Sequence, residues 1–221
     1  MRYKVNSKEY WDERFYSLDW EKKGGNFQTI NHAKRYVLLL DILKGFNGSI
    51  CDFGCAEGDA FKVYRKYFPQ AKFTGVDFSE NAISKARERY GNFVNFIVGG
   101  KECVPFSDII IASHVLEHLE NDRDVINELR SKCKRLFIIV PVEEENSCEE
   151  HRRRYHINSY DELQPKRATL CKAGWSFSLS QTIYQIYIKN VVRYLIFGRT
   201  IKEPRQIIFE FEGLNECGQT P

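Results

Sequence analysis

Five short runs of apolar residues, each followed by a stretch with helical spacing, constrain the fold of this 221-residue chain most strongly. β-branched and aromatic side chains dominate the runs, and two of them, Ile109–Ala112 and Leu136–Val140, are apolar at every position. Strands that are buried on both faces have this pattern, which is typical of a parallel sheet covered by helices on both sides. The alternation therefore predicts a doubly wound α/β fold.

The same patterns place the individual elements along the chain. The predicted parallel strands are Ser49–Phe53, Lys72–Val76, Phe93–Val98, Asp108–Ala112 and Arg135–Val140. Helical spacing predicts helices over Ser7–Tyr16, Asn31–Leu43, 59–67, 79–90, 119–132 and 182–197. A capping-box pattern at Ser159 and Glu162 predicts one more helix, which ends near Gly174. Trp175–Ser180 and Gln206–Glu212 alternate apolar and polar residues and are expected to form a final antiparallel pair.

Composition and charge exclude several classes of protein. Hydrophobic residues make up 43% of the chain, enough for a folded core. The 33 basic and 30 acidic residues give a net charge of +3, which is too balanced to predict binding to nucleic acid or to a membrane surface. The seven cysteines form no C-x-x-C pair, and Cys148, His151 and His156 lack the paired spacing of a zinc site. With no apolar run long enough to span a membrane, we expect a soluble, cytoplasmic protein.

The residues that follow the first two strands point to a ligand with a cationic end and a ribose. In an open α/β sheet, ligands bind at the carboxyl ends of the strands. Asp52-Phe-Gly54-Cys-Ala-Glu-Gly58 follows the first strand, and it is neither a dinucleotide fingerprint nor a phosphate-binding loop with a lysine. The Asp52 carboxylate would repel a pyrophosphate and attract an ammonium group. Asp77 follows the second strand, where an acidic side chain accepts hydrogen bonds from ribose hydroxyls, and Phe78 could lie against a purine.

Three segments together resemble the class I S-adenosylmethionine-dependent methyltransferases, in particular their small-molecule branch. They are Asp52-x-Gly54-x-Ala56-x-Gly58, Gly75-Val-Asp77-Phe78-Ser79 and Ser113-His114-Val-Leu-Glu117-His118-Leu119. The resemblance extends from about Tyr36 to Gly174. It implies a Rossmann-like, mostly parallel seven-stranded sheet with an antiparallel C-terminal strand pair, and S-adenosyl-L-methionine as the cofactor.

The resemblance also assigns roles to particular residues. The expected cofactor-binding residues are Asp52, Gly54, Cys55, Ala56, Gly58, Asp77, Phe78, Gly100 and Ser113. The chain has Gly99-Gly100-Lys101-Glu102 where the family usually has Gly-Asp, so recognition of the adenine amino group is left to Glu102 or to a backbone group. His114 and His151 are the expected catalytic residues, since a histidine suits general-base catalysis at neutral pH.

These assignments predict methyl transfer to a small-molecule acceptor, with a hydroxyl oxygen as the expected methylated atom. Residues 1–45 are expected to form a helical cap, 46–180 the cofactor-binding core, and 181–221 a lid helix and the last strand of the same domain. The segment 183–197 is apolar on nearly all sides. It is expected to be a substrate lid or an association surface, either in a homodimer or at a membrane surface, with packing on the N-terminal helices as the alternative.

Other functions remain open at this stage. The chain could be a catalytically silent cofactor-binding subunit. An RNA methyltransferase is disfavoured, because no Asn-Pro-Pro-aromatic motif follows the fourth strand and no basic extension is present. His114-x-x-Glu117-His118 also spells an inverted zinc-hydrolase motif, in which two histidines on a helix bind zinc and the glutamate activates water. Because the motif follows a buried strand within the methyltransferase pattern, we expect no metal.

Overall fold

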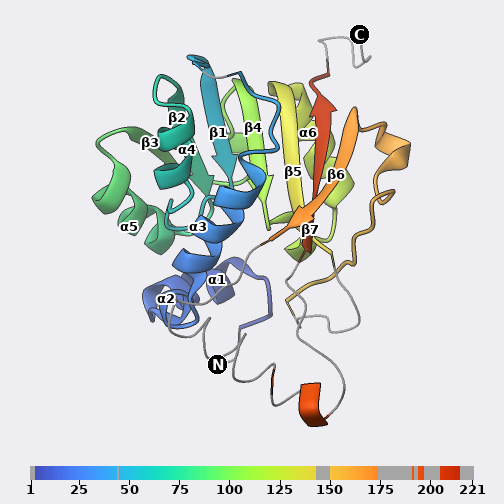
Figure 1. Cartoon of the computed structure of the whole chain (residues 1–221). Coiled ribbons are helices and arrows are strands. Elements are labelled where there is room, and N and C mark those ends of the chain that lie inside the picture. The colour runs from blue at the N-terminus through green and yellow to red at the C-terminus, as the bar shows by residue number, and fades with distance from the viewer. Residues whose placement is uncertain are drawn as a thin grey trace.

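A seven-stranded sheet forms the centre of the protein in a computed structural model, with strand order β3-β2-β1-β4-β5-β7-β6 (Figure 1). The structure describes residues 3–43, 45–142, 150–173, 191, 194–196 and 205–214. Strands β1 to β5 are parallel to their neighbours, whereas β7 runs antiparallel between β5 and β6. The chain therefore has the doubly wound, mostly parallel sheet and the antiparallel C-terminal pair that the sequence predicts.

The strands and helices have the following bounds. The strands are β1 (Ser49–Phe53), β2 (Lys72–Asp77), β3 (Val94–Val98), β4 (Ser107–Ser113), β5 (Cys133–Pro141), β6 (Arg167–Lys172) and β7 (Arg205–Glu212). The α-helices are α1 (Lys8–Tyr16), α2 (Asp19–Lys22), α3 (Gly25–Tyr36), α4 (Phe61–Tyr67), α5 (Glu80–Tyr90) and α6 (Asp122–Ser131). Three 3₁₀ turns complete them: η1 (Lys101–Cys103), η2 (Leu116–His118) and η3 (Asp161–Leu163).

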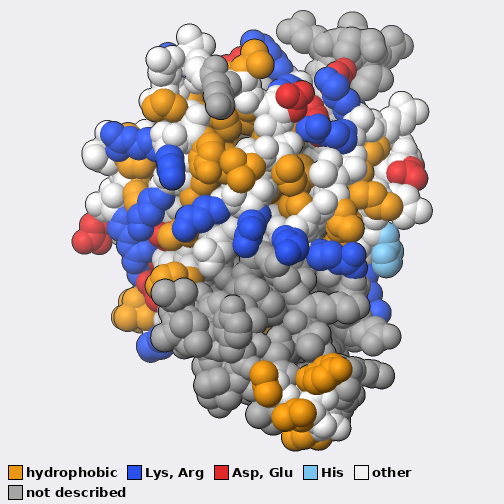
Figure 2. Space-filling model, in the orientation of Figure 1, with side chains coloured by type: hydrophobic (Ala, Val, Ile, Leu, Met, Phe, Trp, Pro, Cys, Tyr) orange, Lys and Arg blue, Asp and Glu red, His pale blue; other side chains and the backbone are white. Residues whose placement is uncertain are grey.

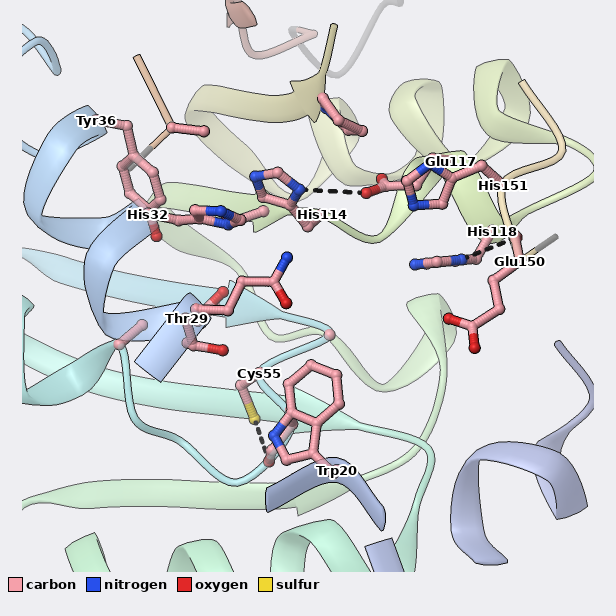
Figure 3. Close-up of a pocket in the computed structure, with 18 of the residues that line it drawn as sticks. Trp20, Thr29, His32, Tyr36, Cys55, His114, Glu117, His118, Glu150 and His151 are labelled. Carbon is pink, nitrogen blue, oxygen red and sulfur yellow. Dashed lines mark hydrogen bonds and ion pairs between the residues drawn. The ribbon is translucent and has the colours of Figure 1, made fainter. Parts of the chain in front are cut away.

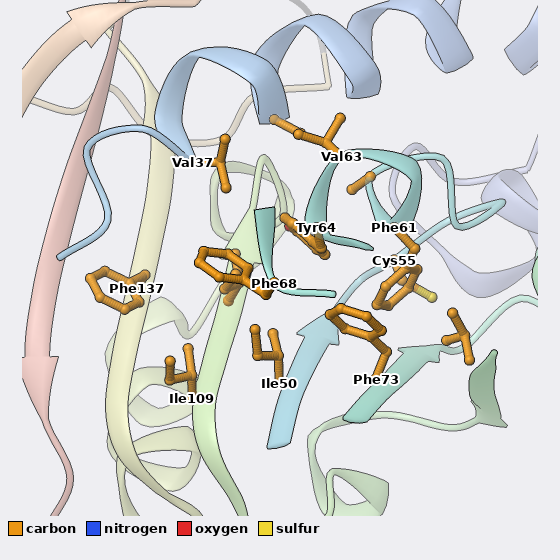
Figure 4. Close-up of a cluster of buried hydrophobic side chains, with 14 of the residues drawn as sticks. Val37, Ile50, Cys55, Phe61, Val63, Tyr64, Phe68, Phe73, Ile109 and Phe137 are labelled. Carbon is orange, nitrogen blue, oxygen red and sulfur yellow. The ribbon is translucent and has the colours of Figure 1, made fainter. Parts of the chain in front are cut away.

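Each face of the sheet has its own apolar cluster, because successive side chains of a strand point to opposite faces. Ile109 and Ile111 of β4 pack on the side of α3, α4 and α5 (Figure 4). Ile110 and Ala112 of the same strand pack on the side of α6. Burial on both faces explains why β4 is a continuous apolar run in the sequence.

The N-terminal helices lie at the edge of the sheet where β1 and β4 end (Figure 1). Asp12 of α1 accepts hydrogen bonds from the Ser79 hydroxyl and from the backbone and side-chain nitrogens of Asn81, at 2.5, 3.2 and 2.8 Å. These contacts fix α1 against the start of α5. The N-terminal region therefore covers the end of the sheet at which the sequence predicts the ligand.

The structure confirms the five parallel strands and helices α4, α5 and α6 within a few residues, but it corrects two other predictions. The helix predicted over Asn31–Leu43 is α3, which ends at Tyr36, and Leu38 and Leu43 are exposed. The helix predicted from Ser159 to Gly174 is wrong: only the short turn η3 forms there, and β6 follows it.

Strand β6 also corrects the C-terminal pair. The partner of β7 is Arg167–Lys172, whereas the sequence predicted Trp175–Ser180. Trp175–Ser180 lies outside the described residues, as does nearly all of the predicted lid, 183–197.

No helix in the described part of the chain is long and apolar enough to cross a membrane. Figure 2 shows a row of Lys and Arg side chains across one face of the molecule.

Candidate active site

A pocket of about 350 Å³ lies where β1 and β4 end, next to α3 and the other N-terminal helices (Figure 3). Its volume falls in the range of small-molecule sites. Seven of the predicted site residues line it: Asp52, Gly54, Cys55, Ala56, Ser113, His114 and His151. The remaining four, Gly58, Asp77, Phe78 and Gly100, lie outside its lining. The structure therefore brings both predicted catalytic histidines and the start of the glycine-rich loop to one cavity.

The loop after β1 turns through left-handed backbone conformations. Gly54 has φ +75°, and a Cβ there would lie 2.3 Å from Cγ2 of Val115, so glycine is required both for conformation and for space. Ala56 adopts φ 48°, which is a strained conformation for a residue with a side chain. The backbone N–H of Ala56 donates to Asp77 Oδ2 at 2.9 Å, and that of Ser79 donates to Oδ1 at 2.9 Å. Asp77 thus ties the loop to the end of β2.

Asp52 places a buried carboxyl group at the base of the pocket. Its pKa is raised to about 8, because burial and the charge of Asp77 together outweigh the hydrogen bond from Tyr64, which lowers the pKa. The Tyr64 hydroxyl in turn shares a hydrogen bond with that of Tyr36, whose ring also lines the pocket. A cationic group in the pocket would stabilise the ionised form of Asp52, so the site fits an ammonium group.

His114 follows β4 in a left-handed conformation, φ 56°, and faces the pocket. Its ring stacks on that of His32 of α3, with centroids 4.1 Å apart. Nε2 lies 3.1 Å from Oε1 of Gln206, and Nδ1 lies 3.4 Å from Oε1 of Glu117. Strained residues of this kind cluster at functional sites. Both ring nitrogens of His114 already face side-chain oxygens.

Glu117, His118 and His151 meet beside His114, and one potential ligand atom from each lies within 4.8 Å of the others. Glu117 is fully buried. Its burial raises the pKa of the carboxyl group, but His114 and His118 outweigh that effect and hold the pKa below the usual value. Burial lowers the pKa of His118. The arrangement differs from the zinc-hydrolase motif, because His114 precedes a short 3₁₀ turn and does not share a helical face with His118.

Several pocket residues come from α1 to α3 and from Glu150, and the sequence analysis did not assign them to the site. Gln28, His32 and Tyr36 of α3 line the pocket at spacings of four residues, a pattern that places them on one helical face. That polar and aromatic stripe was the signal available in the sequence. The Glu150 carboxylate accepts hydrogen bonds from Tyr10 and Arg14 of α1, each at 2.6 Å.

Comparison with known proteins agrees with this geometry. Residues 51–135 match a methyltransferase domain family. The matched segment includes the Gly54–Ala56 loop and His114 of the pocket. Its curated relatives include malonyl-[acyl-carrier protein] O-methyltransferase of Neorickettsia risticii, 32% identical over 83 residues, which are 37% of this chain and 33% of that protein. Trans-aconitate 2-methyltransferase of Rhodopseudomonas palustris is 31% identical over 74 residues, 33% of this chain and 29% of that protein. The matched segment spans about a third of each relative.

Solved structures share the methyltransferase fold over most of the chain. A putative methyltransferase in complex with the Haloferax volcanii Trm112 methyltransferase activator has a TM-score of 0.66 at 16% identity, covering 92% of this chain and 97% of that one. The plantazolicin methyltransferase BpumL, in complex with SAH, has a TM-score of 0.55 at 14% identity, covering 95% and 96%.

Proposed function

We propose that the protein is an S-adenosylmethionine-dependent methyltransferase that acts on a small-molecule acceptor, with a hydroxyl oxygen as the methylated atom. One observation carries the proposal: the pocket at the ends of β1 and β4 is lined by Asp52 and the Gly54–Ala56 loop, and this loop lies inside the segment that matches the methyltransferase family. In this proposal residues 1–45 form a cap over the cofactor-binding core.

Residues of the first two strand ends would hold the cofactor. Asp52 would pair with its ammonium group, and the backbone of Gly54–Ala56 with Ser113 would border its methionine end. Asp77 would accept from the ribose hydroxyls, since each of its carboxylate oxygens has a second lone pair beyond the one used by a backbone N–H. Phe78 and Gly100 would lie on the adenine side. When bound, S-adenosylmethionine supplies a sulfonium methyl group that a nucleophilic oxygen can attack.

The other residues of the pocket would position the acceptor and exclude water. Holding two reactants in line contributes roughly 7–11 kcal/mol to a barrier reduction of this kind. His114 is the first candidate for the base that accepts the hydroxyl proton, and His151 the second. To act as a base, His114 must first lose its contact with either Gln206 or Glu117, because both of its ring nitrogens now face side-chain oxygens.

Cofactor binding and methyl transfer can be tested separately. We expect calorimetry to show one S-adenosylhomocysteine bound per chain. A screen of hydroxylated small molecules with S-adenosylmethionine, read by mass spectrometry of the products, should then reveal a gain of one methyl group. If neither cofactor form gives binding heat, the proposed function is wrong; binding without any product in the screen favours a catalytically silent subunit.

His114→Ala tests the catalytic assignment. With a hydroxyl acceptor, we expect kcat to fall by about 10²–10⁴-fold, the usual size of general-base assistance, while cofactor affinity changes little. The measurement is kcat alongside the calorimetric Kd for S-adenosylhomocysteine. His156→Ala is the matched control, because His156 is an exposed histidine on the segment that follows His151. An unchanged kcat in His114→Ala would remove this residue from catalysis and leave His151 as the candidate.

A further inference from the structure

We propose that Glu117, His118 and His151 bind one divalent transition-metal ion on the acceptor side of the pocket. The three side chains line the pocket, and one potential ligand atom from each lies within 4.8 Å of the others. The sequence analysis expected no metal here, and the reasons to revise that expectation are geometric. The binding of the ion does not depend on the proposed function.

A backbone contact holds the two segments of the site together. The Arg152 N–H donates to the backbone oxygen of Glu117 at 2.8 Å, so the turn η2 and the segment after β5 lie side by side. The rings of His118 and His151 then meet edge to face, with centroids 5.2 Å apart (Figure 3). The three candidate ligands are thus fixed next to one another before any ion binds.

Glu117 is the strongest sign that a ligand belongs at this place. Glu117 is 0% exposed, and neither of its carboxylate oxygens has a hydrogen-bond partner among the described residues. His114 Nδ1 lies 3.4 Å from Oε1, which is an ion pair only when that imidazole is protonated. A buried carboxylate without hydrogen bonds destabilises the folded state, whereas coordination of a cation would give one of its oxygens a partner.

His118 has the hydrogen bond that metal-binding histidines usually have. Its Nδ1 lies 3.0 Å from the backbone oxygen of Glu150, which can only accept, so Nδ1 carries the proton and Nε2 keeps a lone pair. Ligating histidines commonly donate their other ring N–H to a carbonyl or a carboxylate in this way. Tyr10 and Arg14 hold the Glu150 side chain at 2.6 Å each, and this fixes the residue whose carbonyl orients His118.

The donor set indicates the class of metal. Two imidazoles and one carboxylate suit Zn²⁺, Fe²⁺, Co²⁺ or Mn²⁺ better than Mg²⁺ or Ca²⁺, which prefer oxygen ligands. Bonds near 2.0–2.1 Å in a tetrahedron place ligand atoms about 3.3 Å apart, so side-chain rotations of about 1 Å would close the site. Three protein ligands leave a coordination position open toward the pocket. If the proposed function holds, an acceptor oxygen would occupy that position.

Cobalt binding to the purified full-length chain tests the site without any methyl-transfer assay. After dialysis against a chelator, Co²⁺ is titrated and followed by its visible absorption, and bound Co²⁺ is then displaced with Zn²⁺. We expect one Co²⁺ per chain without a thiolate charge-transfer band. Loss of a hydrogen-bond partner outside the coordination sphere typically weakens metal binding by about 10- to 100-fold. We expect a larger loss of Co²⁺ affinity in each of three variants that remove a ligand: Glu117→Gln, His118→Ala and His151→Ala.

Control variants distinguish this site from surface binding and from misfolding. His156→Ala removes an exposed histidine and should bind Co²⁺ as the unmodified chain does. Glu117→Gln keeps the side-chain shape, so its metal-free melting temperature should not fall, while the rise in melting temperature with Co²⁺ should disappear. Wild-type affinity in both His118→Ala and His151→Ala, a thiolate band, or no stoichiometric binding would each overturn the site. S-adenosylhomocysteine binding in the same preparation reports on the proposed function independently.

Discussion

Two neighbouring strands, β1 and β4, end in the same backbone conformation but carry very different groups. Each is followed by a left-handed residue, Gly54 after β1 and His114 after β4. Around the loop after β1, the carboxylates are satisfied: Asp77, at the end of β2, accepts two backbone N–H groups, and Glu57 in the loop is paired with Lys85 and Arg89. After β4, the buried carboxylate of Glu117 has no hydrogen-bond partner in the described part of the chain.

The two strand ends therefore differ in what they present to a ligand. The end of β1 lets a ligand approach the backbone closely, whereas the end of β4 presents side chains. Glycine at position 54 leaves room for Val115 and exposes backbone to the pocket. His114 adopts the same left-handed conformation, which is strained for a residue with a side chain, and places an imidazole in the cavity. The β1 end therefore suits a ligand recognised by shape and by Asp52, and the β4 end suits a ligand that bonds to nitrogen and oxygen atoms.

Gly54→Ala should have the largest effect on this comparison. The left-handed conformation costs roughly 1–2 kcal/mol for a residue with a Cβ, and contact with Val115 at 2.3 Å adds an overpacking cost of about 1–3 kcal/mol. We expect the free energy of unfolding in urea to fall by about 2–5 kcal/mol.

Gly45→Ala is the matched control, because Gly45 has φ +87° but nothing within 4 Å of an added Cβ. It should lose only the conformational part, roughly 1–2 kcal/mol. Equal losses in the two variants would show that Val115 moves aside freely and that the β1 end tolerates a side chain as the β4 end does.

Asp52 should make both stability and ligand binding depend on pH. Its pKa is about 8 in the folded protein, against an ordinary value of 3.8 for an aspartate, so between these values the folded state holds one proton more than the unfolded state. The free energy of unfolding should therefore fall as pH rises through this window, by up to ~1.4 kcal/mol per pH unit. An ammonium ligand favours the ionised form, so affinity for S-adenosylhomocysteine should rise up to about pH 8, by at most about tenfold per unit.

Of the groups that face Asp52, one also titrates in this window. Burial raises the pKa of Tyr36, Tyr64, Cys51 and Cys55 well above their usual values, and Asp77, with a pKa of about 6, is the other group that titrates there. Asp52→Asn should flatten the stability slope above about pH 6, where Asp77 no longer titrates, and abolish proton release on binding at that pH, as measured by calorimetry in two buffers of different ionisation enthalpy. Identical slopes in both proteins would mean that Asp52 is ionised in the free protein.

Ala56→Gly should have the smallest effect and the opposite sign. Relief of the left-handed strain at φ 48° should raise the free energy of unfolding by roughly 1–2 kcal/mol. The greater conformational freedom of glycine in the unfolded chain should lower it by about 0.4–1 kcal/mol. We expect a gain of about 0.5 kcal/mol in the free energy of unfolding. Ala86→Gly, the same change inside helix α5, should instead lose about 1 kcal/mol or more. If both variants lose stability equally, Ala56 is not strained.

The parallel half of the sheet could be predicted because its signal is local. Strands such as β4 are buried on both faces, so every residue is apolar and the run is visible without knowing its neighbours. Strand β6 has no such signal, since Arg167 and Lys172 are exposed and its pairing with β7 links residues about 40 positions apart. The Ser159–Glu162 pattern resembled a helix start, but only one 3₁₀ turn follows it.

The residues of the site also divide into those with a local signal in the sequence and those without one. Asp52, Gly54 and His114 could be placed because each lies at the end of a predicted strand or within two residues after it. His32 and Glu150 reach the pocket only through packing of α3 and of the segment after β5 on the sheet. The convergence of His118 with His151 depends on the backbone contact between Glu117 and Arg152, which no local pattern specifies.

The bridge from α1 to Glu150 sets the order in which the pocket can be completed during synthesis. Tyr10 and Arg14 belong to α1, but their common acceptor follows them by 140 and 136 residues along the chain. Helix α1 can dock on Ser79 and Asn81 much earlier. A nascent chain therefore carries an open, incomplete cavity until the segment after β5 emerges, and ligand capture must await that segment.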